Sequence, residues 1–433
     1  MNLSTIPVVR LVIQQLLNYG VHHIVIAPGS RNAPITVGLT THKAFTTYSI
    51  VDERSAGFFA IGLSQQLHEP VAVLCTSGSA LLNIYPAVSE AYYSRYPLVV
   101  ISADRPTYQI DIGNGQTIRQ SGVFSKHLIS ETSLLQDITH NQSAIMESNS
   151  QQLIDVQSTP QEVESEQKII EKNNTKYLQK VFSAMLSQRG PVHVNIPLEE
   201  PLYEFNDSPS ISVKVKKKIE KPPSLNALNN YYKAINKASK IMILIGVSDG
   251  NILSKKSIQK INSCSSIIVM KEHTSNVFNE SFISNIDRLI GPIELQSDSD
   301  SVFDELSPEI VISLGGMIVS KKIKSFLRNY KPRKHFHIGN NISKDSFYSG
   351  VEHINTTANK FFENIVKNNP EVDKLILFRK SQKFLDRILF ILFAEDKNLI
   401  PTNAIPRIVE SWALADDLHY KPLYELFKTF FIH

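Results

Sequence analysis

The sequence has little cysteine and no long uninterrupted run of apolar residues. Only Cys75 and Cys264 occur in 433 residues, which excludes a disulfide framework and a cysteine-based zinc site and favours a reducing compartment. The most apolar helix-length stretch, residues 384–394, is interrupted by Asp386 and Arg387 and is far too short to span a bilayer. Because the first residues also lack the basic and apolar regions of a signal peptide, we expect a cytoplasmic protein without a membrane span.

An excess of one charge is missing as well. The 45 Lys and Arg residues nearly balance the 41 Asp and Glu residues, and the net charge is +4. The densest basic run, at residues 214–221, is followed by Pro222 and Pro223 and is typical of a solvated linker rather than a nucleic-acid surface. The histidines show no metal-ligand spacing. We therefore expect no nucleic-acid partner and no metal site built from these residues.

What the sequence does contain is an alternation of apolar strands with helix-length segments from residue 7 to residue 106. The runs at 71–75 and 98–101 are continuously apolar, as strands buried on both faces require. Residues 79–94 are expected to form one helix between them. The pattern predicts an α/β fold with a parallel sheet covered by helices on both faces, and binding pockets at the C-terminal ends of its strands.

The alternation and the changes in composition predict the domain boundaries. Residues 1–204 form the first α/β domain, with a polar insertion at about 140–175 that we interpret as a mobile excursion. A linker at 205–224 leads to a second, open α/β domain at 225–360, whose strands each end at glycine or a polar turn. A helical, lysine-rich tail follows at 361–433.

Residues 27–34, Ala-Pro-Gly-Ser-Arg-Asn-Ala-Pro, end a strand and begin a helix. The unpaired N–H groups of a helix N-terminus attract an anion, and the guanidinium of Arg31 matches the geometry of a carboxylate. Ser30 and Arg31 could therefore bind a carboxylate, although the octet could equally be an ordinary turn shaped by proline and glycine.

Two further turns belong to the same edge of the sheet. Asp52 is placed to cap the following helix, so Glu53 either compensates the helix dipole or faces a ring nitrogen of a ligand. The small residues at 76–80, Thr-Ser-Gly-Ser-Ala, do not match the nucleophile elbow of serine hydrolases, which we exclude. They instead let a planar ligand approach the backbone, with Asn83 as a polar contact one turn later.

A loop after the fourth strand carries further polar candidates. Its Gly-Asn-Gly sequence at 113–115 lacks the third glycine and the preceding strand of a dinucleotide fingerprint, so that reading fails. We expect Arg105, Gln116 and Arg119 to converge near Ser30 and Arg31 as a cationic pocket, unless the arginines form structural ion pairs. In the second domain, Lys321 follows a strand and either lies on the surface or faces a cleft between the domains.

Together these segments resemble the thiamine-diphosphate-dependent 2-succinyl-5-enolpyruvyl-6-hydroxy-3-cyclohexene-1-carboxylate synthases of menaquinone biosynthesis. The match is most specific in the first domain and fades beyond about residue 370. The resemblance implies the thiamine-diphosphate-binding fold for the first domain. The matching stretches are residues 27–34, 51–54, 70–86, 101–106, 115–120 and 190–203.

The resemblance implies that isochorismate and 2-oxoglutarate are joined by a 1,4-addition with loss of carbon dioxide. It gives the carboxyl of Glu53 a hydrogen bond to N1′ of the cofactor pyrimidine, which activates the cofactor toward the 2-oxo acid. Two sets of residues follow from it. The substrate side comprises Ser30, Arg31, Arg105, Gln116 and Lys321, and the cofactor side comprises Pro28, Glu53, Ser77, Gly78 and Asn83.

The resemblance also implies features that the sequence does not display. Family members continue into a third domain, which binds Mg²⁺ and the diphosphate through a Gly-Asp…Asn segment and completes a homodimer or homotetramer. No such segment follows Asn359, and we interpret residues 361–433 as the start of that domain. Three interpretations stay open: a synthase without its last domain, a truncated or degenerate homologue that binds carboxylates or a partner without catalysis, and another thiamine-diphosphate enzyme such as a 2-oxo-acid decarboxylase.

Overall fold

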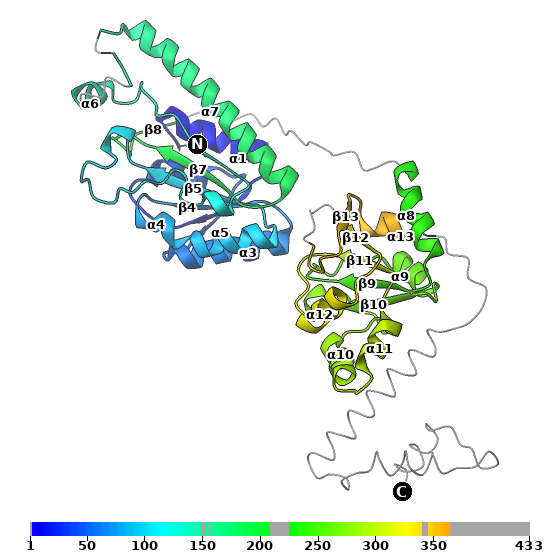
Figure 1. The fold of residues 1–433 in the computed structure, drawn as a ribbon. Helices are drawn as coiled ribbons and strands as arrows, with labels where there is room; N and C mark the ends of the chain where they lie inside the picture. Colours follow the sequence, from blue (N-terminus) through cyan, green and yellow to red (C-terminus); the bar gives the residue numbers. More distant parts are fainter. Residues whose placement is uncertain are drawn as a thin grey trace, which may run out of the picture. The chain divides into compact units, whose positions relative to one another are not determined.

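The computed structural model of the protein describes residues 2–148, 153–155, 157–207, 225–339, 345–363 and 365. The chain divides into two units, residues 1–221 and 222–433, and each has its own parallel sheet (Figure 1). This two-sheet α/β architecture is the one that the alternating pattern predicts.

The first unit is built on a six-stranded sheet in which all neighbouring strands run parallel. Its order, β3-β2-β4-β5-β7-β6, brings the C-terminal ends of β2, β4 and β5 side by side at one edge. β4 and β5 are buried along their whole length, as their continuous apolar runs predict. The strands are β2 (His23–Ile26), β3 (Thr46–Ser49), β4 (Val71–Cys75), β5 (Leu98–Asp104), β6 (Ser130–Ser133) and β7 (Val192–Pro197).

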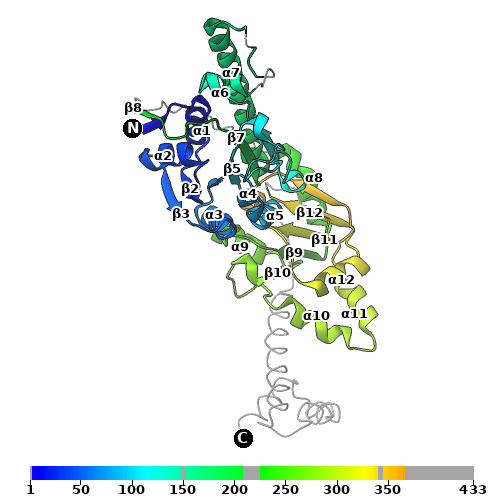
Figure 2. The same cartoon turned by 90° about the vertical axis from the view of Figure 1, so that its left-hand side faces the viewer.

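Helices cover both faces of this sheet (Figures 1 and 2). On one face α1 (Pro7–Asn18), α2 (Ala33–Thr41) and α7 (Pro160–Gln188) pack on side chains such as Ile24 and Leu74. On the other face α3 (Glu53–Leu67), α4 (Ser79–Asn83) and α5 (Tyr85–Ser94) pack on the alternate side chains, such as Val25 and Val73. Successive residues of each strand thus serve opposite halves of the core.

Much of the polar region at 140–175, interpreted from its composition as a mobile excursion, is helical. It contains α6 (Gln142–Glu147) and the first half of α7. A capping box joins Thr159 and Glu162 at the start of α7, with Pro160 in the first turn. Residues at helical spacing, including Val163, Ile170 and Leu178, are buried along this helix. Composition did not predict these helices, because the apolar stripe of α7 is narrow and its other residues are polar.

Three other boundaries differ from the prediction. The helix expected at 79–94 is broken at Ile84 into α4 and α5, since Pro86 lacks the N–H that a continuous helix needs. The segment expected to be linker begins with a strand, β8 (Phe205–Asp207), which pairs antiparallel with β1 (Asn2–Ser4). The main sheet also extends one strand beyond β7, to β6, which was not predicted.

The second unit has a five-stranded parallel sheet of order β10-β9-β11-β12-β13. Its first four strands fall where the sequence predicts strands, at 241–245, 267–270, 310–314 and 335–338, and β13 is additional. One face packs on α8, α9 and α13, and the other on α10, α11 and α12. The strands are β9 (Ile241–Ile245), β10 (Ile267–Lys271), β11 (Ile310–Leu314), β12 (Lys334–Ile338) and β13 (Val351–Ile354). The helices are α8 (Leu225–Lys237), α9 (Lys255–Asn262), α10 (Ile286–Glu294), α11 (Ser299–Leu306), α12 (Lys321–Asn329) and α13 (Ala358–Glu363).

Most of the predicted tail lies outside the described residues, apart from the end of α13 and Ile365. The basic run at 214–221 lies outside them too. Of the helices that the structure does describe, none combines the length and the apolar character that crossing a membrane requires.

Candidate functional site

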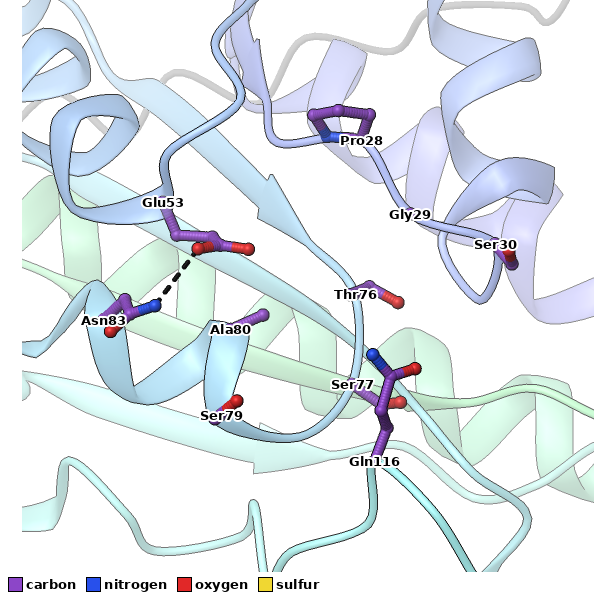
Figure 3. A pocket seen from close by; sticks show the side chains of 10 residues that line it. All are labelled: Pro28, Gly29, Ser30, Glu53, Thr76, Ser77, Ser79, Ala80, Asn83 and Gln116. Atoms are coloured by element: carbon purple, nitrogen blue, oxygen red, sulfur yellow. Dashed lines mark hydrogen bonds between the residues drawn. The ribbon is translucent and has the colours of Figure 1, made fainter.

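A cavity of about 380 Å³ opens at the C-terminal edge of the first unit's sheet (Figure 3). It lies where the turns after β2, β3 and β4 meet the loop that follows β5, as expected for a parallel α/β sheet. Its volume falls in the range of small-molecule sites, about 300–1,000 Å³. It is lined by Pro28, Gly29, Ser30, Glu53, Thr76, Ser77, Ser79, Ala80, Asn83 and Gln116. Six of the ten predicted site residues are among them: Pro28, Ser30, Glu53, Ser77, Asn83 and Gln116.

Glu53 is the acidic residue of this cavity. Asp52 caps α3 by accepting a hydrogen bond from the backbone N–H of Ser55 at 2.7 Å, as predicted, and so fixes Glu53 as the first helical residue. The amide Nδ2 of Asn83 donates to Oε2 of Glu53 at 3.1 Å. Figure 3 shows Glu53 and Asn83 pointing toward each other from α3 and α4. Asn83 thus orients one carboxylate oxygen and leaves Oε1 for a ligand.

The turn between β4 and α4 forms the floor of the cavity. Ser77 is 2% exposed, and its Oγ has no hydrogen-bond partner within the described part of the chain. A buried hydroxyl without a partner is costly, so a ligand atom that bonds to it would be stabilised. The next residue, Gly78, has a φ of +83°, and a Cβ there would lie 3.0 Å from the backbone oxygen of Gln116. Gly78 therefore shapes the wall through its backbone without lining the cavity itself.

A second close approach joins the turns after β2 and β4. A Cβ on Gly29 would lie 2.4 Å from Cβ of Thr76, a separation that side chains do not tolerate. Only glycine lets these two strand ends come together, and their contact closes one side of the cavity.

Arg31 and Arg105 form an ion-pair cluster with Glu200. Arg31 is 5% exposed and donates to the carbonyl of Leu198 at 3.1 Å and to Oε1 of Glu200 at 2.8 Å. Nη1 of Arg105 lies 3.8 Å from the same carboxylate oxygen, and its Nη2 donates to the carbonyl of Gly115 at 3.3 Å. Both arginines are thus held by the protein, which is the structural alternative that the sequence left open.

The two arginines do not line the cavity with Ser30 and Gln116. Burial, with a smaller contribution from the charge of Arg105, holds the pKa of Arg31 below its ordinary value, and Glu200 acts in the opposite direction. Nε of Arg105 is buried and has no partner among the residues that the structure describes. The cluster therefore retains one unsatisfied donor near the loop that carries Gln116.

Two of the predicted cationic contacts lie elsewhere. Arg119 does not converge on the pocket, because its exposed side chain pairs with Asp111 at 2.8 Å. Lys321 belongs to the second unit, where it is the exposed first residue of α12, a helix capped by Ser320. Its neighbour Lys322 forms a salt bridge with Glu294. Lys321 is thus a surface residue of its own unit.

Three residues with clear structural roles at this edge were not predicted. Gln120 accepts a hydrogen bond from the N–H of Gly78 at 2.8 Å, and Asn195 accepts one from Gln120 at 2.7 Å. Glu200 pairs with the arginines. All three lie inside the stretches 115–120 and 190–203 that carry the resemblance. Their place in these stretches could have marked them as candidates. Sequence spacing alone, however, does not distinguish a buried supporting side chain from one on the surface.

The geometry excludes nucleophilic catalysis at two places. Nε2 of His193 lies 2.8 Å from Oγ of Ser102, and its Nδ1 lies 3.8 Å from Oε2 of Glu131, so the three residues are arranged as in a catalytic triad. Ser102 is fully buried within β5, however, so a substrate cannot reach its hydroxyl. Cys75 ends β4, and burial, with a smaller contribution from Glu53, raises the pKa of its thiol well above the ordinary value. Across the described ranges, no group of His, Cys, Asp or Glu residues could hold a metal ion. A carboxylate, an amide and a free hydroxyl around a narrow space instead suit a planar, nitrogen-containing ligand.

Comparison with known proteins agrees with this chemistry. Residues 6–128 match the family model of the thiamine pyrophosphate enzymes' N-terminal thiamine-pyrophosphate-binding domain. A solved structure from Mycobacterium smegmatis, assigned as a thiamin diphosphate-dependent enzyme, shares the fold with a TM-score of 0.54. It is 13% identical in sequence, and the match covers 84% of this chain and 64% of that one.

Curated relatives share more of the sequence, and those named here are all called 2-succinyl-5-enolpyruvyl-6-hydroxy-3-cyclohexene-1-carboxylate synthase. The protein of Christiangramia forsetii is 43% identical over 80% of this chain, and that of Flavobacterium psychrophilum 42% over 86%. The chain spans only 58% and 60% of their lengths. The protein of Flavobacterium johnsoniae is 39% identical over 94% of this chain and 70% of its own length. The chain therefore belongs to the 2-succinyl-5-enolpyruvyl-6-hydroxy-3-cyclohexene-1-carboxylate synthase family.

Proposed function

We propose that the cavity of the first unit binds the aminopyrimidine ring of thiamine diphosphate. The observation that carries this proposal is the placement of Glu53, whose Oε2 is held by Asn83 while Oε1 stays available to a ring nitrogen. Ser77 also lines the cavity, and the close approach of Gly29 to Thr76 closes one side of it. A planar ring with nitrogen atoms on its rim fits these groups.

We propose further that the whole protein joins 2-oxoglutarate to isochorismate with release of carbon dioxide, the step of menaquinone biosynthesis that the family carries out. Bound thiamine diphosphate supplies a nucleophilic carbon and an electron sink for decarboxylation. Glu53 holds a proton at its carboxyl group and shares it with the ring nitrogen, so that its side chain acts as the general acid–base group of the site. Asn83 keeps that carboxyl group in one orientation.

The substrates of this proposed reaction carry carboxylates, which suits the cationic edge of the pocket. Ser30 and Gln116 line the cavity and can donate to a carboxylate directly. The side chain of Arg105 is 24% exposed, so its guanidinium can add a charge-assisted hydrogen bond. Arg31 contributes through the Glu200 cluster. For Lys321 we propose a substrate contact only on the basis of the family resemblance.

The diphosphate and Mg²⁺ require groups beyond this cavity. We propose that they are bound by residues outside the described ranges or in the part of the relatives that this chain does not match. A homodimer or homotetramer in the cytoplasm is the arrangement that the resemblance implies.

Saturation-transfer NMR of the 433-residue chain with thiamine tests the pyrimidine site. We expect transfer to the pyrimidine protons, and we expect Glu53→Ala to weaken binding at least tenfold because the ring nitrogen loses its partner. Glu53→Gln should bind within a few fold of the original chain, since an amide still donates, yet it cannot transfer a proton in turnover. Arg54→Gln, which changes an exposed neighbour, is the matched control. The proposal fails if the unaltered chain shows no transfer to thiamine. It also fails if Glu53→Ala binds thiamine as tightly as the unaltered chain does.

A further inference from the structure

The inner wall of the cavity is a contact between two backbones. Gly78 is in the turn after β4, and Gln116 is in the loop after β5 with a φ of +56°. A Cβ on Gly78 would lie 3.0–3.1 Å from the backbone atoms of Gln116. A loop held in a left-handed conformation against a glycine needs support from its surroundings, because neither segment favours this position by itself.

Gln120 provides that support. It is 1% exposed, its Oε1 accepts from the N–H of Gly78 at 2.8 Å, and its Nε2 donates to the carbonyl of Ala103 at 3.2 Å. Backbone N–H and C=O groups cannot exchange roles, so these two bonds permit a single orientation of the amide. The side chain thus ties the Gly78 turn to β5 from within the loop that carries Gln116.

The amide of Gln120 is fixed by a buried chain of hydrogen bonds. Its Nε2 also donates to Oδ1 of Asn195 at 2.7 Å, and Nδ2 of Asn195 donates to Oδ2 of Asp104 at 2.8 Å. Oγ of Ser102 donates to the same Oδ1 at 2.7 Å and lies 2.8 Å from Nε2 of His193. All of these side chains are buried. A network that is this well satisfied is rigid, and it leaves Gln120 no second arrangement.

We propose that Gln120 is a positioning residue that sets the pyrimidine site by clamping the Gly78 turn. It does not touch the ligand, since it does not line the cavity, and it acts through the backbone of Gly78. The clamp holds the turn that carries Ser77 against the loop that carries Gln116, and both of these residues line the cavity. This inference rests on the proposed function, in that the ligand which benefits is the aminopyrimidine.

Gln120→Ala tests the clamp, with Gln167→Ala as the matched control. Gln167 is 4% exposed and accepts from the N–H of Ile138 at 2.9 Å, so it is a buried amide clamp of the same kind away from the cavity. We expect Gln120→Ala to speed hydrogen exchange in peptides spanning residues 74–82 at least tenfold and to weaken thiamine binding at least tenfold. Gln167→Ala should speed exchange near Ile138 and leave thiamine binding within twofold.

The outcomes separate the clamp from the proposed function. Unchanged exchange at 74–82 in Gln120→Ala overturns the clamp whatever the ligand does. Faster exchange at 74–82 with unchanged thiamine affinity shows that the clamp exists but does not affect the pyrimidine site, which overturns the proposed role of Gln120. If the unaltered chain does not bind thiamine while the exchange behaves as expected, the proposed function fails and the structural clamp stands.

Gln120→Glu tests the donor role without removing atoms. Ionised, the new carboxylate faces two acceptors, the carbonyl of Ala103 and Oδ1 of Asn195, whereas the protonated acid can donate to one of them. We expect its thiamine affinity, taken as a ratio to the unaltered chain at each pH, to fall at least tenfold between pH 5.5 and pH 8.5. A ratio that is independent of pH overturns the donor role.

Discussion

A buried histidine pair in the second unit predicts that this unit loses stability in mild acid. His335 and His337 on β12 both bond to Oγ of Ser313 on β11, through Nε2 at 2.9 Å and Nδ1 at 3.0 Å. Two other titratable groups face the pair: Asp345, 4.0 Å from Nδ1 of His335, and His353, whose ring lies 5.8 Å from that of His337. Burial is the main cause that lowers the pKa of each buried ring to about 4.

The direction and size of the effect follow from proton linkage. Each ring is neutral in the folded state down to about pH 4, while the unfolded chain takes up its proton near pH 6.5, so the stabilisation is complete above pH 6.5 and is lost as pH falls toward 4. With those values, one histidine destabilises the folded unit by about 2 kcal/mol at pH 5 and by about 3 kcal/mol below pH 4. Because the two rings share Ser313, we expect about 2–4 kcal/mol for the pair at pH 5.

The loss of stability in acid can be measured by urea unfolding of the full chain at pH 7, 6 and 5. At each urea concentration, a short pulse of a disulfide reagent that reacts in acid labels the thiols that unfolding exposes. Cys264 is buried in the second unit and Cys75 in the first, so mapping the two labels separates the units. His337→Asn and His335→Gln replace the nitrogen that each ring presents to Ser313 and remove its titration. We expect each variant to flatten the pH dependence at Cys264 by about 2 kcal/mol between pH 7 and pH 5. An unchanged slope at Cys264 in both variants would refute the reasoning.

Two further predictions concern the first unit. Gly29→Ala should weaken thiamine binding at least tenfold, because its Cβ would lie 2.4 Å from Cβ of Thr76. Gly62→Ala, whose Cβ would have no atom within 4 Å, should not change binding in the same NMR titration. Equal binding by both variants contradicts the close-contact argument. Glu200→Gln should destabilise the unit by about 1–2 kcal/mol in urea unfolding read at Cys75, since it removes the carboxylate that forms the ion pair with the buried Arg31, although the 62% exposure of Glu200 moderates the loss. Asp111→Asn breaks the exposed pair with Arg119 and should cost less than about 0.5 kcal/mol, so similar losses in the two variants would show that burial of Arg31 is unimportant.

The parallel sheets could be predicted because their strands are buried on both faces. Val71–Cys75 and Leu98–Asp104 contain continuous apolar runs that few other structures explain. β6 and β13 were missed because they are edge strands of mixed polarity, Ser130–Ser133 and Val351–Ile354, which local pattern does not separate from loop. α7 was missed for a different reason. Most of its residues are polar, and its narrow apolar face is evident only once its packing against α1 is known.

Residues of the site were predictable where the topology alone brings them together. Glu53 begins a helix and Ser77 follows a strand, so the carboxyl edge of the sheet places both beside the cavity. The prediction that Arg119 converges on the pocket was wrong. The direction of a side chain on a loop depends on its interaction partner, which for Arg119 is Asp111. Gln120 could not be predicted, since its role depends on a hydrogen bond to a backbone N–H forty-two residues earlier.

Ser30 and Arg31 are adjacent in sequence and face different surroundings. Ser30 lines the cavity, whereas the guanidinium of Arg31 is buried against the carbonyl of Leu198 and the carboxylate of Glu200. The guanidinium of Arg31 instead holds the Glu200 carboxylate, which also lies 3.8 Å from Nη1 of Arg105. Under the proposed function, a substrate carboxylate that approaches Nη1 of Arg105 would compete with Glu200 for that group. The affinity for such a carboxylate would then depend on how firmly Arg31 retains Glu200, and not on direct contact with Arg31.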